Sequence, residues 1–574
     1  MVFGDAFAPS CASTTDLAAV LASEGFDVLA RSRAVFALRR SPKMGSDAFL
    51  SETEAQCAGL DGVVLGSGAG VQTGVPWGPR LKSALLELPS DTGLNTLRHL
   101  RGVFRGFVHS DASNQLVLFS DHFARKPLYS ARTPLNGWAF SSDLLLLVRL
   151  LRLLGAVPRL NESATYSLLT FGYMLGDETL VEGVRKVPPG SICVHGASES
   201  RTQYYQVRNE PEVTGDLRRI VSNLDDLFRQ AVERQVAKER DVGANHLVTL
   251  SGGLDSRTCL AYVLRGTHND VTCLTFSESD YLDHTIARRI ALDRGVAFAF
   301  VPLDGGGYLT ESLQETVALN GGLVLYSGAA HQYHALRHID CACYGILHTG
   351  QIGDLVLGSY LSGPHHTPPD MATVRKCAYS RLLLGRGTSL TNARLAAYET
   401  SEMFAFYERC VNGVFNGDRM TEAFLEPLSP FLDVDFAEYA FRISPRLRYQ
   451  NGVYREWLRH SMPCMARYAW EKYGASPLLP HVALRAVRLS RIGVGVLRHG
   501  RTGKGLSMNP FGYWWTKNGG LQEWMNGQFL DTYALLHDHR ELADDADRLF
   551  CSGTPLEKTQ VLTLLEAVRV MNLR

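Results

Sequence analysis

The chain has 574 residues, with 58 basic and 58 acidic side chains and therefore no net formal charge. At roughly 150 residues per domain this length predicts about two to four domains, and ordinary composition, with 45% hydrophobic residues, excludes a disordered or fibrous chain. The balanced charge also argues against a dedicated nucleic-acid binder, which usually carries a basic excess.

Nothing in the sequence predicts a membrane segment. The longest apolar run, residues 144–157, is interrupted by Arg149 and Arg152 and is shorter than the roughly 20 residues that cross a bilayer. The first ten residues, MVFGDAFAPS, lack the basic and apolar regions of a signal peptide. Eleven scattered cysteines fit a reduced protein better than a disulfide scaffold. We therefore expect a soluble cytoplasmic protein.

Up to about residue 200 the chain is rich in predicted β-strands. The runs 104–109 and 115–120 are separated by Asp-Ala-Ser-Asn, which is typical of a hairpin. Shorter runs follow near residues 121–130 and 137–143, and Pro188-Pro189-Gly190 predicts a turn before another strand.

An α/β pattern begins near residue 216. Residues 216–238 have the apolar spacing of an amphipathic helix. The following runs alternate strand, helix, strand, helix, strand up to residue 303, which predicts a parallel sheet with crossover helices. From about residue 372 the pattern is mostly helical. We place the domain boundary near residue 210, giving domains 1–210 and 211–574.

The segment Ser251-Gly252-Gly253-Leu254-Asp255-Ser256 lies between a predicted buried strand and a helix. Such a loop has free backbone N–H groups and the positive end of the helix dipole, which bind phosphate oxygens. An aspartate beside a phosphate requires an intervening cation, so Asp255 points to Mg²⁺.

These residues carry a family resemblance. The segment 251–256 resembles the ATP loop of the asparagine synthetase superfamily, a pyrophosphatase-type (PP) loop. Residues 350–354 (GQIGD) resemble its second loop, 426–433 (EPLSPFLD) its Glu-x-Arg-x-Pro-Phe-Leu-Asp segment, and 501–514 its lysine-containing segment. DHFARKPLY, WAFSSD and KVPPGS resemble the family's glutaminase-type domain.

The resemblance implies an α/β fold with two parts: an N-terminal αββα Ntn-type sandwich and a C-terminal PP-loop ATP-pyrophosphatase domain. It implies ATP and Mg²⁺ as cofactors, and amide formation through an acyl-adenylate with release of AMP and pyrophosphate. Mg²⁺ would bind Asp255 and Asp354, and Lys504 would stabilise charge in the transition state. The implied nucleotide-binding residues are Leu250, Ser251, Gly252, Gly253, Leu254, Asp255, Ser256, Phe276 and Gly350.

The sequence departs from the family where glutamine would be hydrolysed. The family's glutaminases carry a nucleophilic cysteine after the initiator methionine, whereas this chain has Val2, and its first cysteine is Cys11. We expect a degenerate glutaminase domain, so that the amine comes from elsewhere.

A second departure concerns the amine site. Gln351 occupies the position of a glutamate in asparagine synthetases and of a tyrosine in β-lactam synthetases. Glu426 matches the glutamate that helps deprotonate the amine in the latter, so Glu426, with Gln351, is the candidate for orienting or deprotonating the amine.

Three functions stay open. The first is macrolactam or lactam formation in natural-product biosynthesis, such as lasso peptide cyclisation; its carboxylate substrate would be a precursor peptide, with a leader-binding or protease partner protein. The second is an amidotransferase that uses free or partner-supplied ammonia on a small acid or sugar acid. The third is a nucleotide-binding scaffold without turnover. None involves nucleic acid or membrane.

Overall fold

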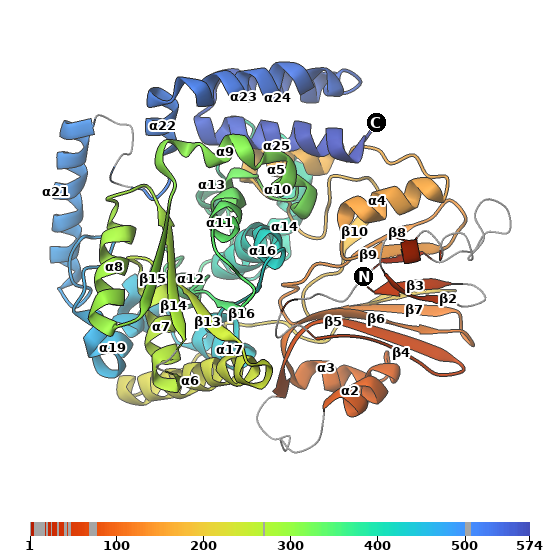
Figure 1. Ribbon diagram of the computed structural model, residues 1–574, viewed down its shortest axis with the longest axis horizontal. Helices are drawn as coiled ribbons and strands as arrows, with labels where there is room; N and C mark the ends of the chain where they lie inside the picture. The colour runs from red at the N-terminus through yellow and green to blue at the C-terminus, as the bar shows by residue number, and fades with distance from the viewer. Residues whose placement is uncertain are drawn as a thin grey trace.

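The computed structural model describes residues 2–4, 18, 21–23, 26–30, 34–38, 43, 47–67, 77–267, 270–499, 505 and 507–574. Within them the chain forms an N-terminal β-sandwich and an α/β region built on a parallel sheet, which lie on opposite sides of Figure 1. The predicted α/β class is confirmed.

The N-terminal region contains two antiparallel sheets. The first has the strand order β10 (Val184–Lys186), β8 (Tyr129–Arg132), β9 (Trp138–Ser141), β1 (Val2–Gly4), β3 (Val35–Leu38) and β2 (Asp27–Ala30). The second has the order β12 (Ser200–Gln203), β11 (Ser191–His195), β7 (Gln115–Ser120), β6 (Leu100–Ser110), β5 (Gln56–Ser67) and β4 (Asp47–Glu52). Strands β6 and β7 form the predicted hairpin, with Arg105 opposite Ser120.

Helices cover both outer faces of this sandwich. Helices α2 (Trp77–Leu86) and α3 (Asp91–His99) lie against the second sheet, while α4 (Leu144–Leu153) lies over the first, as Figure 1 shows. Helix α5 (Glu162–Phe171) follows α4 in the chain. The layers are therefore helix, sheet, sheet, helix, as predicted.

The second region is built on a five-stranded, all-parallel sheet. Its order is β15 (Ala297–Pro302), β14 (Val271–Ser277), β13 (Asn245–Thr249), β16 (Tyr344–His348) and β17 (Glu426–Leu428). The chain leaves β13 toward β14 on one side and reaches β16 on the other. The gap between the carboxyl ends of β13 and β16 is therefore the topological switch point, where ligands bind in open α/β sheets.

The helices around this sheet begin and end where the sequence provides caps. Helix α6 (Leu217–Val242) starts after Asp216, whose side chain accepts a hydrogen bond from the Arg218 N–H, and ends at Gly243 with φ 68°. Helix α7 (Leu254–Gly266) follows β13, and α8 (Leu282–Arg294) follows β14. The sequence pattern predicts all three.

The rest of the chain is mostly helical, as predicted for the part after about residue 372. The elements are η1 (Asp304–Gly306), α9 (Tyr308–Glu311), α10 (Leu313–Asn320), α11 (Ser327–Arg337), α12 (Gly353–Val356), α13 (Met371–Cys377), α14 (Thr388–Ala396), α15 (Ser401–Phe404), η2 (Ala405–Val414, a π-helix), α16 (Phe415–Glu422), η3 (Pro430–Leu432), α17 (Val434–Arg442), α18 (Pro445–Arg448), η4 (Tyr449–Asn451), α19 (Gly452–Ser461), α20 (Pro463–Ala466), α21 (His481–His499), α22 (Phe511–Lys517), α23 (Gly519–Thr532), η6 (Tyr533–Leu536), α24 (Arg540–Ser552) and α25 (Pro555–Met571).

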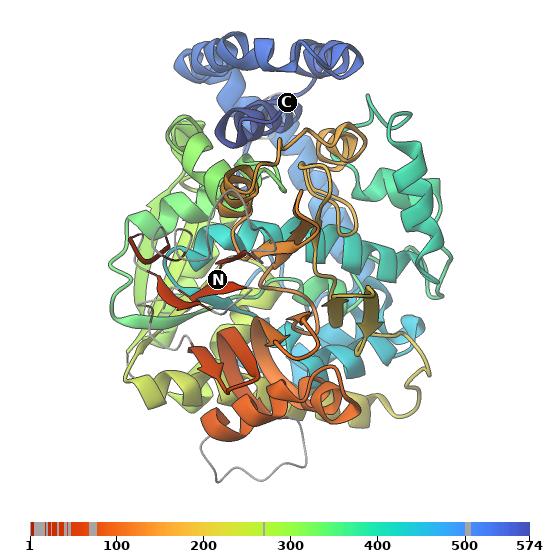
Figure 2. The same ribbon diagram turned by 90° about the vertical axis from the view of Figure 1, so that its right-hand side faces the viewer.

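The C-terminal helices share a hydrophobic core with the N-terminal region. Figures 1 and 2 both place α23, α24 and α25 at one end of the molecule. Buried side chains of α4 and α5 belong to the same cluster as those of α25, for example Leu147, Leu168 and Leu565. The two regions are therefore packed together rather than joined only by the linker near residue 210.

Among the described residues, no helix is both long and apolar enough to cross a membrane.

Candidate functional site

The predicted phosphate loop connects β13 to α7 and is fixed by its own side chains. The Ser256 hydroxyl accepts a hydrogen bond from the Ser251 N–H at 2.9 Å, and the Ser251 hydroxyl accepts one from the Gly253 N–H at 3.1 Å. The Gly252 N–H donates to Asp283 on α8 at 2.7 Å. The loop is thus held in one conformation between two helix N-termini.

Arg257 holds the same loop from inside the protein. Its side chain is 0% exposed, and its guanidinium donates to the Gly253 carbonyl at 2.8 Å and to the Gly252 carbonyl at 2.6 Å. A further bond reaches the Ala469 carbonyl at 2.7 Å. Because a guanidinium offers five donors in a fixed plane, one side chain ties the loop to the segment after α20.

The second glycine loop, which follows β16, packs directly against the start of α7. A Cβ at Gly350 would lie 2.4 Å from the Ser256 nitrogen, and one at Gly353 would lie 2.9 Å from the Asp255 Cγ. Between these glycines Ile352 has φ 69°, an outlier for a β-branched residue of the kind that clusters at functional sites. Only glycine at these two positions permits the observed contact.

This contact brings the two predicted metal ligands together. The Asp354 N–H donates to Asp255 Oδ2 at 3.0 Å, although the residues are 99 positions apart. Burial and the neighbouring Asp354 carboxylate raise the pKa of Asp255 to about 8. Its other oxygen, Oδ1, is buried and has no hydrogen-bond partner within the normal distance among the described residues, although the neighbouring Tyr454 hydroxyl lowers the pKa of this carboxyl. Two adjoining carboxylates with an unsatisfied oxygen fit Mg²⁺, which binds oxygen ligands and relieves their repulsion.

A cavity of about 290 Å³ opens at the switch point. The predicted nucleotide residues that line it are Leu250, Ser251, Gly253, Asp255, Ser256, Phe276 and Gly350. The other two predicted residues do not line it. Leu254 is buried in the hydrophobic core, and Gly252 bonds through its backbone to Asp283 and Arg257.

Sequence reasoning missed several residues of this cavity, namely Thr249, Leu274, Thr275, Asp283, His331, Gln332, Thr349 and Met508. Asp283 could have been found, because an aspartate at the start of the helix that follows β14 must lie at the same sheet edge as the loop. Burial, followed by repulsion from Glu471, raises its pKa to about 7.

Lys504, the predicted charge-stabilising lysine, lies outside the described residues, as does Cys11. Met508, four residues further along the chain, lines the cavity. Its carbonyl accepts a hydrogen bond from the Glu278 N–H at 3.0 Å. The role of Lys504 therefore stays a prediction.

Glu426, which the sequence analysis assigns to the amine, lies among lysines of the N-terminal region. It is the first residue of β17, and in the register of the sheet it lies beside Ile346 of β16, four residues before Gly350. Its two carboxylate oxygens form ion pairs with Lys43 and Lys126, both at 2.7 Å. The residue lines neither of the two cavities at the switch point. Both partner lysines come from the N-terminal region, so Glu426 belongs to the contact between the regions.

A second cavity, of about 320 Å³, adjoins the first. The two share His331, Gln332 and Gln351 as lining residues. Asp354 lines the second cavity, together with Arg409 of the π-helix η2 and Asp418 of α16. π-Helical turns are frequent at functional sites. The predicted residue Gln351 is thus placed between the two cavities.

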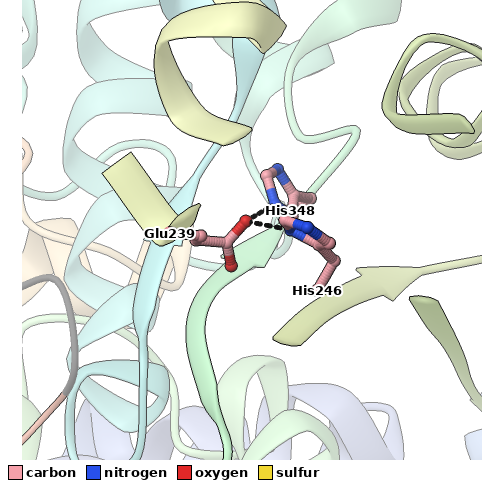
Figure 3. A group of neighbouring side chains, drawn as sticks. All are labelled: Glu239, His246 and His348. Carbon is pink, nitrogen blue, oxygen red and sulfur yellow. Dashed lines mark hydrogen bonds and ion pairs between the residues drawn. The ribbon is translucent and has the colours of Figure 1, made fainter. Parts of the chain in front are cut away.

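A buried polar cluster lies beneath the loops, on α6, β13 and β16 (Figure 3). Glu239 contacts His246 and accepts from His348 Nε2 at 2.7 Å. Ligand atoms of these three residues lie within 4.8 Å of one another, but they bond directly to each other. Burial would raise the pKa of Glu239, yet the charge of His348 and hydrogen bonds from both histidines lower it. The cluster therefore fastens α6 to the two strands that carry the loops.

Together, the fold and the site define a PP-loop α/β domain with an attached Ntn-type sandwich. Comparison with protein families agrees with this class. The model of the glutamine amidotransferase domain matches residues 83–206, and that of asparagine synthase matches residues 223–465. The chain belongs to the asparagine synthetase-like superfamily.

Individual relatives are distant. A putative glutamine-hydrolysing asparagine synthetase of Mycobacterium tuberculosis is 27% identical over 199 residues, which cover 33% of this chain and 30% of the relative. An amidase of Gibberella zeae, chry2, is 26% identical over 318 residues, which cover 49% of this chain and 44% of the relative. The chain therefore matches about a third to a half of the length of these relatives.

Proposed function

We propose that this protein is a Mg²⁺- and ATP-dependent carbon–nitrogen ligase that forms an amide through an acyl-adenylate, releasing AMP and pyrophosphate. The pairing of Asp255 with Asp354 across two glycine loops is the observation that carries the proposal. A scaffold without turnover has no need of a buried, unsatisfied carboxylate oxygen, which costs about 1–3 kcal/mol.

The chain supplies three elements for the first half of the reaction. Ser251 and Ser256 lie at the N-terminus of α7, where hydroxyls and the helix dipole favour phosphate groups. Phe276 and Leu250 give the cavity an apolar wall that suits a purine ring. Asp255 and Asp354 would hold Mg²⁺, which neutralises charge on the triphosphate when bound.

The adjoining cavity suits the carboxylate substrate. Arg409 supplies a positive charge to the wall of this cavity, which Asp354 also lines. The Arg409 guanidinium lies 5.3 Å from the Tyr379 ring centroid and 5.8 Å from that of Tyr360, so its orientation is fixed. A carboxylate held there would lie between the guanidinium and the nucleotide cavity.

The proposal is tested by carboxylate-dependent ATP–pyrophosphate exchange. We expect Asp255→Asn and Asp354→Asn each to lower exchange by about 10²-fold or more, since each removes a charged ligand of the cation. Removing the buried acid at position 255 should not reduce thermal stability measured without Mg²⁺ at pH 8, where ionised Asp255 is unfavourable. Near-normal exchange in both variants would contradict the proposed metal site.

For the second half of the reaction, in which the amide forms, we propose intramolecular ring closure. The most specific version of this proposal is the formation of a lasso-type macrolactam. Val2 in place of the family's nucleophilic cysteine and Gln351 in place of its acidic residue support this choice. Direct amidation with ammonia is the alternative, favoured by the name of the mycobacterial relatives. Product mass separates them. Cyclisation removes a water from a precursor peptide, whereas amidation replaces a hydroxyl of the acid by an amino group.

A further inference from the structure

The second cavity contains a buried carboxylate to which the sequence pattern assigns no role. Asp418 lies on α16 and is 2% exposed. Its Oδ1 accepts a hydrogen bond from Gln351 Nε2 at 2.7 Å. Among the described residues its Oδ2 has no hydrogen-bond partner within the normal distance, and it forms a long ion pair with Arg125 Nη2 at 3.7 Å. The ion pair compensates part of the charge of this oxygen, which can still accept a hydrogen bond from a donor group of a ligand.

The groups around Asp418 hold it in position but leave this oxygen available. Three hydrogen bonds hold Gln351. Its Nε2 donates to Asp418, its Oε1 accepts from the Thr349 hydroxyl at 3.3 Å, and its backbone carbonyl accepts from the Ser429 hydroxyl at 2.8 Å. Burial raises the pKa of Asp418 to about 6, while Arg125 and Gln351 lower it and Glu422 raises it. The carboxylate is therefore a better proton acceptor than an exposed aspartate.

Other groups at the cavity are less suited to accept a proton. Gln351 has no basic atom at neutral pH. Burial lowers the pKa of His331 to about 4, which makes it a poor base. The Asp354 carboxylate is assigned to Mg²⁺ and accepts from the Ser359 hydroxyl at 2.9 Å. Glu426 is compensated by two lysines.

We infer that Asp418 is the carboxylate that binds the incoming amine and accepts one of its protons. This role rests on the proposed acyl-adenylate chemistry. The amine enters as an ammonium ion and transfers one proton to Asp418 Oδ2. Its nitrogen then forms a bond to the acyl carbon, and the bond from that carbon to the AMP oxygen breaks. The second proton lost by nitrogen leaves on the AMP phosphate. The ligand class is a primary amine or ammonia.

The test compares two nucleophiles in Asp418→Asn. Ammonium must lose a proton before it attacks, whereas hydroxylamine is largely unprotonated at neutral pH and needs no base. The acid substrate for the assay is chosen from a panel of amino acids and peptides. It is the acid that gives the largest pyrophosphate exchange with the wild-type protein. Asp435→Asn is the matched control, because Asp435 pairs with Arg101 at 2.8 Å and lines neither cavity.

We expect Asp418→Asn to keep pyrophosphate exchange and hydroxamate formation within about threefold of wild type. Amide formation from ammonium should fall by about 10²-fold or more, the usual contribution of a general base. Asp435→Asn should leave all three rates within about twofold. If Asp418→Asn does not fold, Gln351→Met takes its place in the test. This substitution removes the hydrogen bond that orients Asp418, and it should show the same selective loss to a smaller degree.

The pH profile provides a second readout. The charged groups facing Asp418 are Arg125 from the N-terminal region and Glu422 one turn along α16, with the neutral Gln351 from the loop after β16. Wild-type kcat/KM for ammonium should decline as the pH falls and protonates Asp418, and the residual activity of Asp418→Asn should lack the step that this group contributes to the profile. A variant that loses exchange, hydroxamate and amide equally overturns the role, as do unchanged rates. Failure of exchange with every acid in wild type overturns the proposed function and this role with it.

Discussion

At the scale of single residues, the site depends on charged side chains whose partners are far away in the sequence. Arg257 is the clearest case. A buried arginine without a carboxylate partner is held here by backbone carbonyls of two segments, including Met465 at 3.3 Å and Tyr468 at 3.2 Å. Burial lowers its pKa to about 10, so the guanidinium stays charged at neutral pH. Its planar fork, rather than its charge alone, fits these acceptors.

Arg257→Lys should therefore be damaging although the charge is kept. An ammonium cannot satisfy the same set of carbonyls, and we expect the free energy of unfolding to fall by about 2–4 kcal/mol. The KM for ATP should rise more than kcat falls, because the loop that binds phosphate loses its support. Denaturant unfolding and initial rates measure both quantities.

Arg289→Lys is the control for this change. Arg289 is an exposed residue of α8 that pairs with Asp293 at 3.0 Å, and its replacement should cost less than about 0.5 kcal/mol. Equal effects of the two substitutions would show that Arg257 contributes only charge.

At the scale of elements, the parallel sheet determines which loops meet. β13 and β16 are neighbours, although their residues are about a hundred positions apart. The loops at their carboxyl ends therefore come together at the switch point. Their contact is close enough that Gly350 has no room for a side chain.

Gly350→Ala should separate the two loops. Its Cβ would lie 2.6 Å from the Asp255 carbonyl carbon, and backbone cannot move away as a flexible side chain can. We expect a stability cost of about 1–3 kcal/mol and a loss of pyrophosphate exchange of about 10²-fold, since Asp255 and Asp354 would no longer share a cation.

Gly493→Ala on α21 is the matched control, because a Cβ there meets nothing within 4 Å. This substitution should stabilise the protein by about 0.5–1 kcal/mol through helix propensity. Normal exchange in Gly350→Ala would mean that the contact between the loops is not required for adenylation.

At the scale of the whole molecule, the N-terminal region forms one wall of the synthetase domain. Arg125 donates to the Pro427 carbonyl at 2.8 Å, and its neighbour Lys126 pairs with Glu426. Lys43 donates to the Glu422 carbonyl at 2.7 Å. The sandwich thus supports α16 and β17, which carry Asp418 and Glu426.

Glu426→Gln should destabilise this contact, because Lys43 and Lys126 would lose a buried partner. We expect the free energy of unfolding at pH 7 to fall by about 2–4 kcal/mol. Burial would raise the pKa of Glu426, but Lys126 and Lys43 lower it below its usual 4.5. The same lysines and Arg419 lower the pKa of Glu422 to about 2 against its burial.

The pH dependence follows from these directions. A carboxylate whose pKa is lower in the folded state contributes stability above its unfolded pKa and loses it as the pH falls toward the folded value. The difference between wild type and Glu426→Gln should therefore shrink from pH 7 to pH 3, as measured by denaturant unfolding. Glu233→Gln, at an exposed site of α6, should change stability by less than about 0.5 kcal/mol. A constant difference at all pH values would contradict the ion pairs.

The sequence by itself determined the helices and strands around the first glycine loop, and with them the position of Asp255 in that loop. The apolar spacing of α6 and the run before Ser251 predict a helix, a strand and a loop, and this local order is sufficient to predict that Asp255 lies beside a phosphate site. The prediction for Asp354 comes from the resemblance of residues 350–354 to the family's second loop. Both predictions depend on short glycine-containing segments, in which the backbone can approach a neighbouring segment closely.

Only the tertiary structure decided which of two carboxylates lines the second cavity. Glu426 and Asp418 are eight residues apart, and the sequence favoured Glu426 from its resemblance to a motif. Glu426 begins a parallel strand, so it lies away from the carboxyl edge where the loops meet, beside lysines of the N-terminal region. Asp418 lies on the helix packed at that edge, against Gln351. Strand direction and contacts between distant segments fix this difference, and neither can be obtained from local spacing.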